Sequence, residues 1–231
     1  MSTRIAGDDG ADHETGVAPP TILTASDLRG WVGRCAHILV RHRAYLDRLD
    51  ARLGDGDHGE NMAVGFGDAA RALQPDDDER EAGELLRRLG EMLVAGVGGA
   101  GGSLYGTAFM EAGIAVVGRP GLDPEGLGVA LDAAAEGIAR RGRCKGGDKT
   151  IYDALRPAAD AVAEAVGEGL DLEGAIRRGA VAARAGMLAT RPLIARRGLA
   201  LRLGERSRGH QDPGATSCFL LMRAMLPERT R

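Results

Sequence analysis

The spacing of the apolar residues is the feature that most limits how this chain can fold. They recur at three- and four-residue steps through most of the sequence, whereas the period-two alternation of strands is nearly absent. The first such stripe follows Ser26, the predicted N-cap, and ends before Gly54. It consists of Leu28, Trp31, Val32, Cys35, Ile38, Leu39, Tyr45, Leu46 and Leu49. The pattern predicts an all-α protein.

Further helices are predicted at about 62–73, 85–93, 104–117, 124–138, 148–166, 172–190 and 214–226. Asp123 before Pro124 is typical of a helix start. Helices of similar length favour an antiparallel up-and-down array in one domain, residues 26–231, and the polar residues 1–25 are predicted to form a flexible tail. The core is expected to include Trp31, Ile38, Leu39, Leu89, Leu93, Leu131 and Ile138.

Charge and composition exclude several classes of function. The net charge is −3 and the pI is near 6.0, so neither nucleic acid nor an anionic membrane is an expected partner. No apolar run approaches the length of a membrane span, and residues 1–21 lack the apolar region of a secretory signal. The three cysteines are far apart, which suits a reducing compartment, so a cytoplasmic location is predicted.

Three acidic side chains in the stretch DARLGDGDHGENM, namely Asp50, Asp55 and Asp57, fall within eight positions. They form either a solvated turn or a cation site, and the glycines between them permit a backbone that gathers the carboxylates. An EF-hand is excluded, because Glu60 and Phe66 occupy the positions of its required glycine and glutamate. Oxygen-only ligands point to Mg²⁺ rather than Zn²⁺, with phosphates completing the shell.

The glycine-rich stretch GVGGAGGS, residues 96–103, contains the pattern G-x-G-x-x-G. A predicted helix precedes it instead of a strand, so the dinucleotide fingerprint lacks its context. A P-loop is excluded because Gly102 stands at its lysine position, as Asp148 does in GRCKGGDKT, residues 142–150. Two interpretations stay open: close helix packing, or a loop that holds phosphate oxygens together with the next helix N-terminus.

A third motif, LGERSRGHQDPGATS at 203–217, is either a loop that caps the next helix or part of an anion site. Five arginines between 196 and 208 suit a polyphosphate ligand. His58 and His210 flank Asp-rich turns, but neither has the Cys or Ser neighbour of a nucleophilic triad. No catalytic nucleophile is therefore predicted.

Taken together, LGDGDHGENM, GVGGAGGSLYGT, RGRCKGGDKTIYDAL and LGERSRGHQDPGATS resemble the ADP-binding L subunit of bacterial dihydroxyacetone kinase in order and spacing. That subunit is equivalent to the C-terminal nucleotide domain of single-chain dihydroxyacetone kinases. The resemblance extends from about Leu28 to Met225. It implies a barrel of eight antiparallel helices with the nucleotide bound at one end, and a phosphotransferase with an alcohol acceptor.

By the same resemblance, Asp50, Asp55 and Asp57 match carboxylates that hold two Mg²⁺ ions, which bridge the phosphates of ADP or ATP. The implied nucleotide-binding positions are His58, Gly59, Glu60 and Asn61 beside the phosphates, Ala100 and Gly101 in the glycine loop, Gly142 and Ile151 near the adenosine, and Asp212, Pro213 and Gly214 in a closing loop. No catalytic side chain is implied, since phosphoryl transfer depends on positioning and charge neutralisation.

The resemblance also implies partners. Dihydroxyacetone, or a related small keto-sugar, is held by a separate K subunit, so this chain alone is half an enzyme, and a homodimer is expected. In one branch of the family a phosphotransferase-system M subunit recharges permanently bound ADP, whereas in the other free ATP exchanges. The resemblance leaves both donors open.

Two residues depart from the family pattern. Gly101 stands where Ser or Thr is usual, and Leu199 replaces an arginine expected to touch the nucleotide. Arg197 and Arg202 are the candidates to compensate. The competing interpretation is therefore a non-catalytic nucleotide- or metal-binding regulator that kept the three acids but lost phosphoryl transfer.

Overall fold

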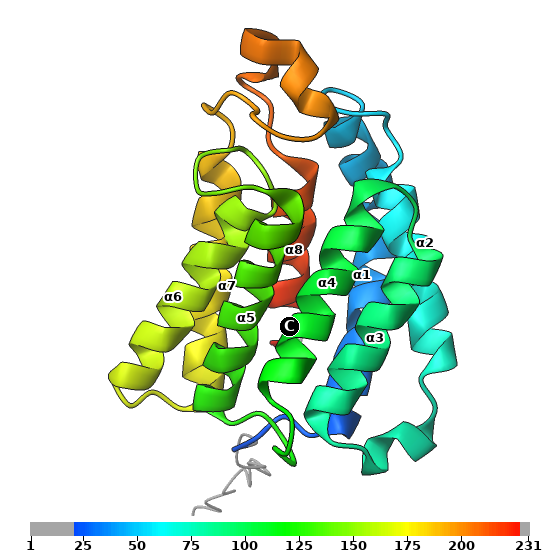
Figure 1. Ribbon diagram of the computed structural model, residues 1–231, viewed down its shortest axis with the longest axis vertical. Coiled ribbons are helices and arrows are strands. Elements are labelled where there is room, and N and C mark those ends of the chain that lie inside the picture. Colours follow the sequence, from blue (N-terminus) through cyan, green and yellow to red (C-terminus); the bar gives the residue numbers. More distant parts are fainter. Residues whose placement is uncertain (1–20, 227–231) are drawn as a thin grey trace, which may run out of the picture.

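The computed structural model describes residues 21–226, which form eight α-helices and two short 3-10 helices (Figure 1). The helices are α1 (Ala25–Asp50), α2 (His58–Ala72), α3 (Ala82–Gly96), α4 (Gly99–Ala115), α5 (Pro124–Gly142), α6 (Tyr152–Gly167), α7 (Leu172–Ala189) and α8 (Pro213–Arg223), with η1 (Pro75–Glu79) and η2 (Leu199–Ser207). The only β pairing in these residues is the isolated bridge between Leu23 and Leu122. The all-α prediction is confirmed.

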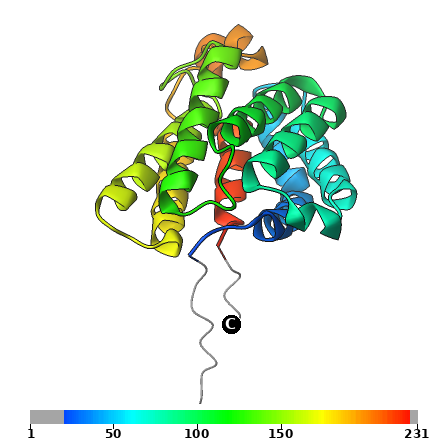
Figure 2. The same ribbon diagram turned by 60° about the horizontal axis from the view of Figure 1, so that its bottom comes forward.

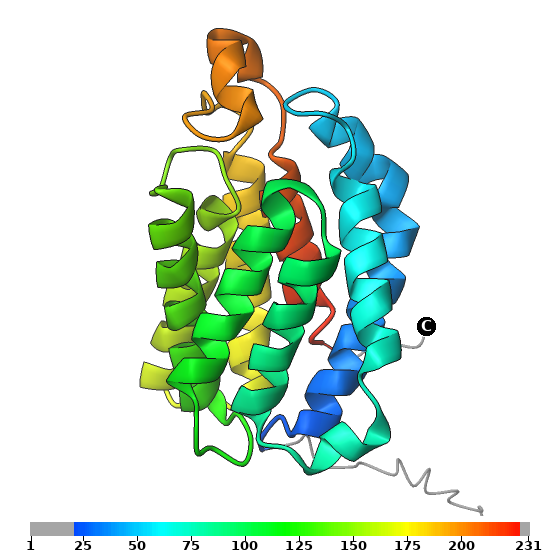
Figure 3. The ribbon, with the colours of Figure 1, turned by 45° about the vertical axis from the view of Figure 1, so that its right-hand side comes forward.

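Consecutive helices run up and down beside one another, and α8 packs against α1, α6 and α7. Figure 2, seen from the lower end, shows α8 between the α5–α7 group and α1–α4. In such an order, alternate connections lie at the same end of the molecule. The α1–α2, α3–α4, α5–α6 and α7–α8 connections therefore share one end, where η2 projects (Figures 1 and 3). All four sequence motifs lie in or beside these connections.

The helix starts follow from their capping residues. Thr24 caps α1: its Oγ1 accepts a hydrogen bond from the Asp27 amide (3.2 Å), and the Asp27 carboxylate accepts one from the Thr24 amide (2.9 Å). The prediction that Ser26 is the N-cap was therefore wrong, because this reciprocal pair begins the helix earlier. Asp123 caps α5 as predicted, with its carboxylate accepting from the Gly126 amide at 2.7 Å.

The predicted tail, residues 1–25, falls largely outside the described residues. Its last part does not: Leu23 pairs with Leu122, and Leu23 and Ala25 are both buried. The folded region thus begins before residue 26. None of the described helices is both long enough and apolar enough to cross a membrane.

The core is built mainly from Leu, Ala and Val side chains. Five of the predicted core residues are buried: Trp31, Leu39, Leu89, Leu93 and Ile138. The other two, Ile38 and Leu131, are only partly buried against the core. Ile38 precedes Leu39 on α1 and points about 100° away from it, towards the edge of the buried face. Leu131 packs at the margin between two buried clusters.

Glycines allow α3 and α4 to pack unusually closely. A Cβ on Gly90 would lie 2.6 Å from the Gly106 carbonyl oxygen, and one on Gly83 would lie 2.7 Å from that of Gly113. Both distances are too short for a carbon and an oxygen, so these positions require glycine. The close approach expected from a chain with 3% aromatic residues is found here.

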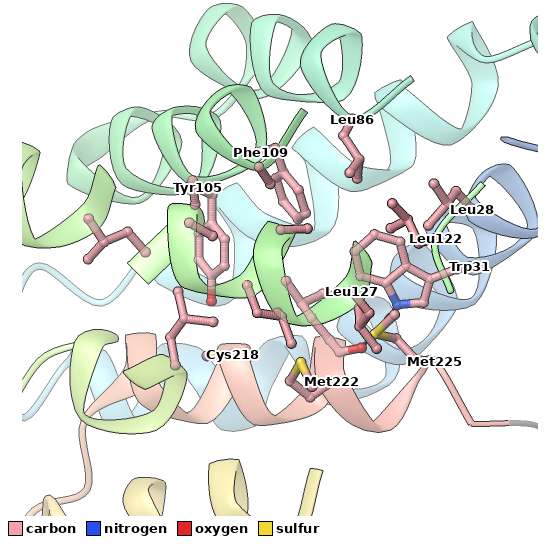
Figure 4. A pocket seen from close by; sticks show the side chains of 18 of the residues that line it. Leu28, Trp31, Leu86, Tyr105, Phe109, Leu122, Leu127, Cys218, Met222 and Met225 are labelled. Atoms are coloured by element: carbon pink, nitrogen blue, oxygen red, sulfur yellow. Dashed lines mark hydrogen bonds between the residues drawn. The ribbon is translucent and has the colours of Figure 1, made fainter. Parts of the chain in front are cut away.

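An apolar cavity of ≈ 80 Å³ remains in the interior, lined by side chains of α1, α4, α5 and α8 (Figure 4). Trp31 and Phe109 meet edge to face on its wall, with ring centroids 5.8 Å apart. Met222 lies below these rings in the view, and Met225 lies next to Trp31.

Candidate functional site

Three carboxylates converge where α1 ends. Asp50 is the last residue of α1, Asp55 and Asp57 lie in the turn that follows, and one oxygen of each lies within 4.8 Å of the others. The turn wraps around Asp50, whose Oδ2 accepts hydrogen bonds from the amides of Gly56 (2.8 Å) and Asp57 (3.1 Å). A Cβ on Gly54 would lie 2.4 Å from Asp50 Oδ1. The sequence LGDGD therefore folds this way because glycine leaves room for the carboxylate.

The cluster has an excess of negative charge. Asp50 is buried, whereas Asp55 and Asp57 are exposed. Burial, and after it the nearby Asp55 carboxylate, raise the pKa of Asp50. Within residues 21–226, none of the ion pairs formed by Arg side chains involves these three acids. An all-oxygen set that lacks a protein cation fits a hard divalent ion such as Mg²⁺.

The predicted phosphate-side residues, 58–61, form the first turn of α2. Gly59 packs against α1, where a Cβ would lie 2.2 Å from the Arg43 carbonyl oxygen. Glu60 also contacts α1, because its carboxylate pairs with Arg43 (2.7 Å) and its amide donates to Asp47 Oδ1 (3.0 Å). Gly59 and Glu60 therefore fix α2 on α1, while Asn61 lies beside the α3–α4 connection.

The glycine segment is mostly helix, contrary to the loop interpretation. α3 ends at Gly96 and α4 begins at Gly99, so Ala100 and Gly101 lie in the first turn of α4. The connection is tight because a Cβ on Gly102 would lie 2.2 Å from the Val97 carbonyl oxygen. A Cβ on Gly101 would lie 3.7 Å from His58 Nδ1. The N-terminal turns of α2 and α4, with amides that lack partners within the helix, thus face each other.

The predicted adenosine-side residues lie at the α5–α6 connection and at the start of α8. Ile151 is buried, and a Cβ on Gly214 would lie 3.4 Å from the Ile151 Cβ atom. Gly142 ends α5, and a Cβ there would lie 3.3 Å from Leu104 on α4. Glycine at these two positions therefore allows close packing against Leu104 and Ile151.

Asp212 caps α8, and Pro213 occupies the first turn of that helix. The Asp212 carboxylate accepts a hydrogen bond from the Ala215 amide at 2.7 Å. Asp212 is almost completely buried, and this burial raises its pKa to about 7. Its amide donates to Thr190 Oγ1 at 3.0 Å, which ties the start of α8 to the end of α7.

Two polar residues near the site were not found from the sequence. His58 Nε2 lies 2.9 Å from Ser217 Oγ, which lies 2.7 Å from the Tyr105 hydroxyl and donates to the Gly214 carbonyl oxygen at 3.0 Å. The prediction that His58 has no Ser neighbour was therefore wrong, because Ser217 is distant in the sequence but adjacent in the fold. Ser217 is fully buried, and burial lowers the pKa of His58 to about 4. The three side chains link α2, α4 and α8 and do not form an accessible nucleophile.

The arginines proposed to replace the missing one differ in their surroundings. Arg197 Nε pairs with Asp148 Oδ2 at 3.2 Å, so its charge is already engaged. Leu199 is 47% exposed on η2. Arg202 is exposed on the same segment, and its side chain forms no ion pair or hydrogen bond with the part of the chain that the structure describes. Arg202 is thus the better candidate.

Comparison with known proteins gives consistent matches. Residues 52–227 match the family model described as the DAK2 domain. The chain is 36% identical over 203 residues to the PEP-dependent dihydroxyacetone kinase, ADP-binding subunit DhaL, of Escherichia coli (strain K12), covering 88% of this chain and 96% of that protein. It is 38% identical over 198 residues to L-erythrulose 1-kinase of Mycolicibacterium smegmatis, covering 84% of this chain but 34% of that longer protein.

The fold also matches a solved structure. The crystal structure of the dihydroxyacetone kinase from C. freundii in complex with AMP-PNP and Mg²⁺ superposes with a TM-score of 0.65 and 23% sequence identity. The match covers 97% of this chain and 37% of that chain. This similarity establishes a shared helical fold.

Proposed function

The chain belongs to the DAK2 domain family, among the ADP-binding subunits of dihydroxyacetone kinases, and from this premise we propose the following division of labour. It is a nucleotide-binding kinase subunit. Its proposed task is to hold Mg·ADP or Mg·ATP and pass a phosphoryl group to dihydroxyacetone or a related small keto-sugar. That acceptor is held by a partner K subunit.

The convergence of Asp50, Asp55 and Asp57 is the observation that carries this proposal. Their oxygens lie within 4.8 Å of one another, and they are the proposed ligands of two Mg²⁺ ions. Bound Mg²⁺ would neutralise and orient the phosphates. The amides that open α4 would donate to phosphate oxygens, and the positive ends of both helix dipoles favour the same charge. In α2 the Glu60 and Asn61 amides already donate to Asp47 Oδ1 and to the Asp57 carbonyl oxygen, so α2 would contribute chiefly its dipole. The protein thus supplies positioning and electrostatic stabilisation.

The nucleoside part is assigned to the small-residue surface at the same end. Gly142, Ile151 and Gly214 come from three different parts of the chain, and Gly214 packs closely against Ile151. Asp212 and Pro213, at the start of α8, are proposed to close the nucleotide in from the η2 side. The predicted nucleotide-binding residues are thus assigned to one end of the molecule.

The share of each relative's length that this chain matches supports a separate partner that binds the acceptor. The match spans nearly all of a protein named as a subunit but 34% of L-erythrulose 1-kinase. A K subunit would supply what the longer protein has in the rest of its chain. Free ATP and an M subunit that recharges ADP are both compatible with this arrangement, and a homodimer stays a prediction.

Two measurements test the proposal. Calorimetric titration of Mg·ADP into the purified chain should show saturable binding that EDTA abolishes. Mixing the chain with a K subunit, dihydroxyacetone and either ATP or a phosphohistidine donor should then give dihydroxyacetone phosphate, and omission of either protein should abolish it. Absence of Mg·ADP binding would refute the proposal.

The second candidate function is a non-catalytic regulator. It is favoured by Gly101, which carries no hydroxyl, and by Leu199, which offers no charge beside the site. The reconstitution separates the two, because a regulator binds Mg·ADP yet gives no product with any donor.

A further inference from the structure

Lys149 is one of only two lysines in a chain with 30 Lys and Arg residues. The other, Lys145, is exposed four positions earlier in the same connection. Lys149 is 2% exposed, which is exceptional for a lysine. Its backbone has a φ of 63°, in the left-handed region that costs a side-chain-bearing residue energy. A residue kept in this conformation and buried is expected to have a specific contribution.

The Lys149 ammonium donates to three backbone carbonyl oxygens. These belong to Thr190 (2.7 Å), Leu193 (3.3 Å) and His210. The three hydrogen atoms of the ammonium are thereby all used. Thr190 follows the last turn of α7, where the helix dipole favours a positive charge.

These contacts join three segments that are far apart in the sequence: the α5–α6 connection, the end of α7 and the segment that leads into α8. Asp212 lies two residues after His210, and its amide bonds to Thr190 Oγ1. The Gly209 amide donates to the Arg191 carbonyl oxygen at 2.7 Å, in the same region. The position of residues 209–214 thus depends on what holds the end of α7.

We propose that Lys149 is a positioning residue for nucleotide binding, which holds the start of α8 against Ile151 by bonding the carbonyls of Thr190, Leu193 and His210. This inference rests on the proposed function, because its effect is exerted on Asp212, Pro213 and Gly214. Lys149 does not touch the nucleotide. An ammonium suits the task because its three donors point in separate directions, whereas a guanidinium is a planar fork.

The charges around the ammonium agree with this role. Burial lowers the pKa of Lys149, and the nearby carboxyl groups of Asp212 and Asp153 oppose this shift by favouring its charged form. The Asp153 carboxylate is itself fixed, because it accepts from the amides of Gly147 (2.5 Å) and Thr150 (2.8 Å). The surroundings of the Lys149 ammonium are therefore fixed on the α6 side as well.

Three variants test the proposal: Lys149→Met, Lys149→Arg and, as a matched control, Lys145→Met. A residue that acts on a binding site through other residues typically changes affinity by about five- to a hundred-and-fifty-fold, so Lys149→Met should weaken Mg·ADP binding by a factor in this range in calorimetry. Lys145→Met should bind like the unmutated chain. Lys149→Arg should not restore binding, and restoration would show that charge alone suffices. Equal affinity of Lys149→Met and the unmutated chain would overturn the proposal.

A measurement on the unmutated chain keeps the test decisive if Lys149→Met does not fold. An amine-reactive acetylating reagent, followed by peptide mass spectrometry, reports each lysine separately. Lys149 should react at least about tenfold more slowly than Lys145, and saturating Mg·ADP should slow Lys149 further without affecting Lys145. A Lys149 rate that Mg·ADP leaves unchanged while it binds would refute the coupling. An unmutated chain that binds no Mg·ADP would instead overturn the proposed function, and with it this role.

Discussion

Asp55→Asn should make the ligand-free protein more stable and, at the same time, insensitive to Mg·ADP. The carboxylates of Asp50, Asp55 and Asp57 lie within 4.8 Å of one another, and the substitution removes two of the three repulsive pairs. At this separation a pair costs about 3.5 kcal/mol at an effective dielectric constant of 20 and about 0.9 kcal/mol in water. Because Asp55 is exposed, the water value is the better guide, which gives about 1–2 kcal/mol in total at low salt.

The assay is thermal unfolding of both proteins at low and high salt, with and without saturating Mg·ADP. A gain of 1 kcal/mol corresponds to about 2–4 °C for a domain of this size, so the ligand-free variant should unfold a few degrees higher. The gain should shrink in high salt. Ligand at a hundred times its Kd stabilises the unmutated chain by about 2.7 kcal/mol, and the variant should lose this shift.

The matched control for this comparison is Asp68→Asn. Asp68 is an exposed aspartate on α2, and it pairs only with Arg71 at the surface. Such a pair contributes about 0–1 kcal/mol, so the control should be unchanged or slightly less stable, with the Mg·ADP shift intact. If Asp55→Asn instead unfolds earlier without ligand yet keeps the full Mg·ADP shift, the cluster is structural and the metal assignment is wrong.

Three further substitutions give separate tests. Leu199→Arg should tighten Mg·ADP binding about ten- to a hundred-fold in calorimetry, because a guanidinium group replaces an exposed leucine side chain. If the variant shows no gain and ADP survives dialysis of the unmutated chain, Arg202 already fills this role. The fold should tolerate Gly101→Ser, because the new Cβ atom would lie 3.7 Å from His58. The added hydroxyl should improve Mg·ADP binding about fivefold. Weaker Mg·ADP binding would contradict the assignment of this turn to the phosphates. Burial raises the pKa of Asp212 from 3.8 to about 7, so the folded chain retains a proton that the unfolded chain releases, and Asp212 lowers stability as the pH rises from about 4 to about 7. His58, whose pKa is lowered to about 4, acts in the opposite direction between about pH 4 and 6.5. Asp212→Asn keeps a capping side chain and removes only the first contribution, so in urea unfolding between pH 4.5 and 7.5 the variant should gain stability relative to the unmutated chain as the pH rises; an unchanged difference would contradict the raised pKa.

The helices were predictable because each buries one stripe of apolar side chains, which fixes its period. Their ends were less so. The glycines of residues 96–103 indicate a loop by propensity, yet they are needed inside α4 because Val97 approaches Gly102 too closely for a side chain. η2 has no apolar stripe to reveal it, and Leu199 and Leu201 are exposed on it.

The gathering of Asp50, Asp55 and Asp57 was predictable because it is local: one glycine-rich turn brings the three together. Contacts between distant segments were not. His58 and Ser217 are separated by 159 residues, and no spacing rule connects them. Lys149 lies in a motif that, from the sequence, reads only as an imperfect P-loop, and its role depends on carbonyl groups, which any residue carries.

The up-and-down order of the helices also sets where another protein can be attached. α1 begins at the end opposite the three acids and has 26 residues, so it spans about 39 Å at 1.5 Å per residue. A module fused in place of residues 1–20 would need a linker of at least about twelve extended residues to reach the acidic end, whereas the 24 residues ahead of Ala25 exceed that length. A short tag that replaces residues 1–20 therefore stays away from the acidic end. This is therefore the end by which the chain can be immobilised on a sensor surface while the opposite end stays open to ligand and partner.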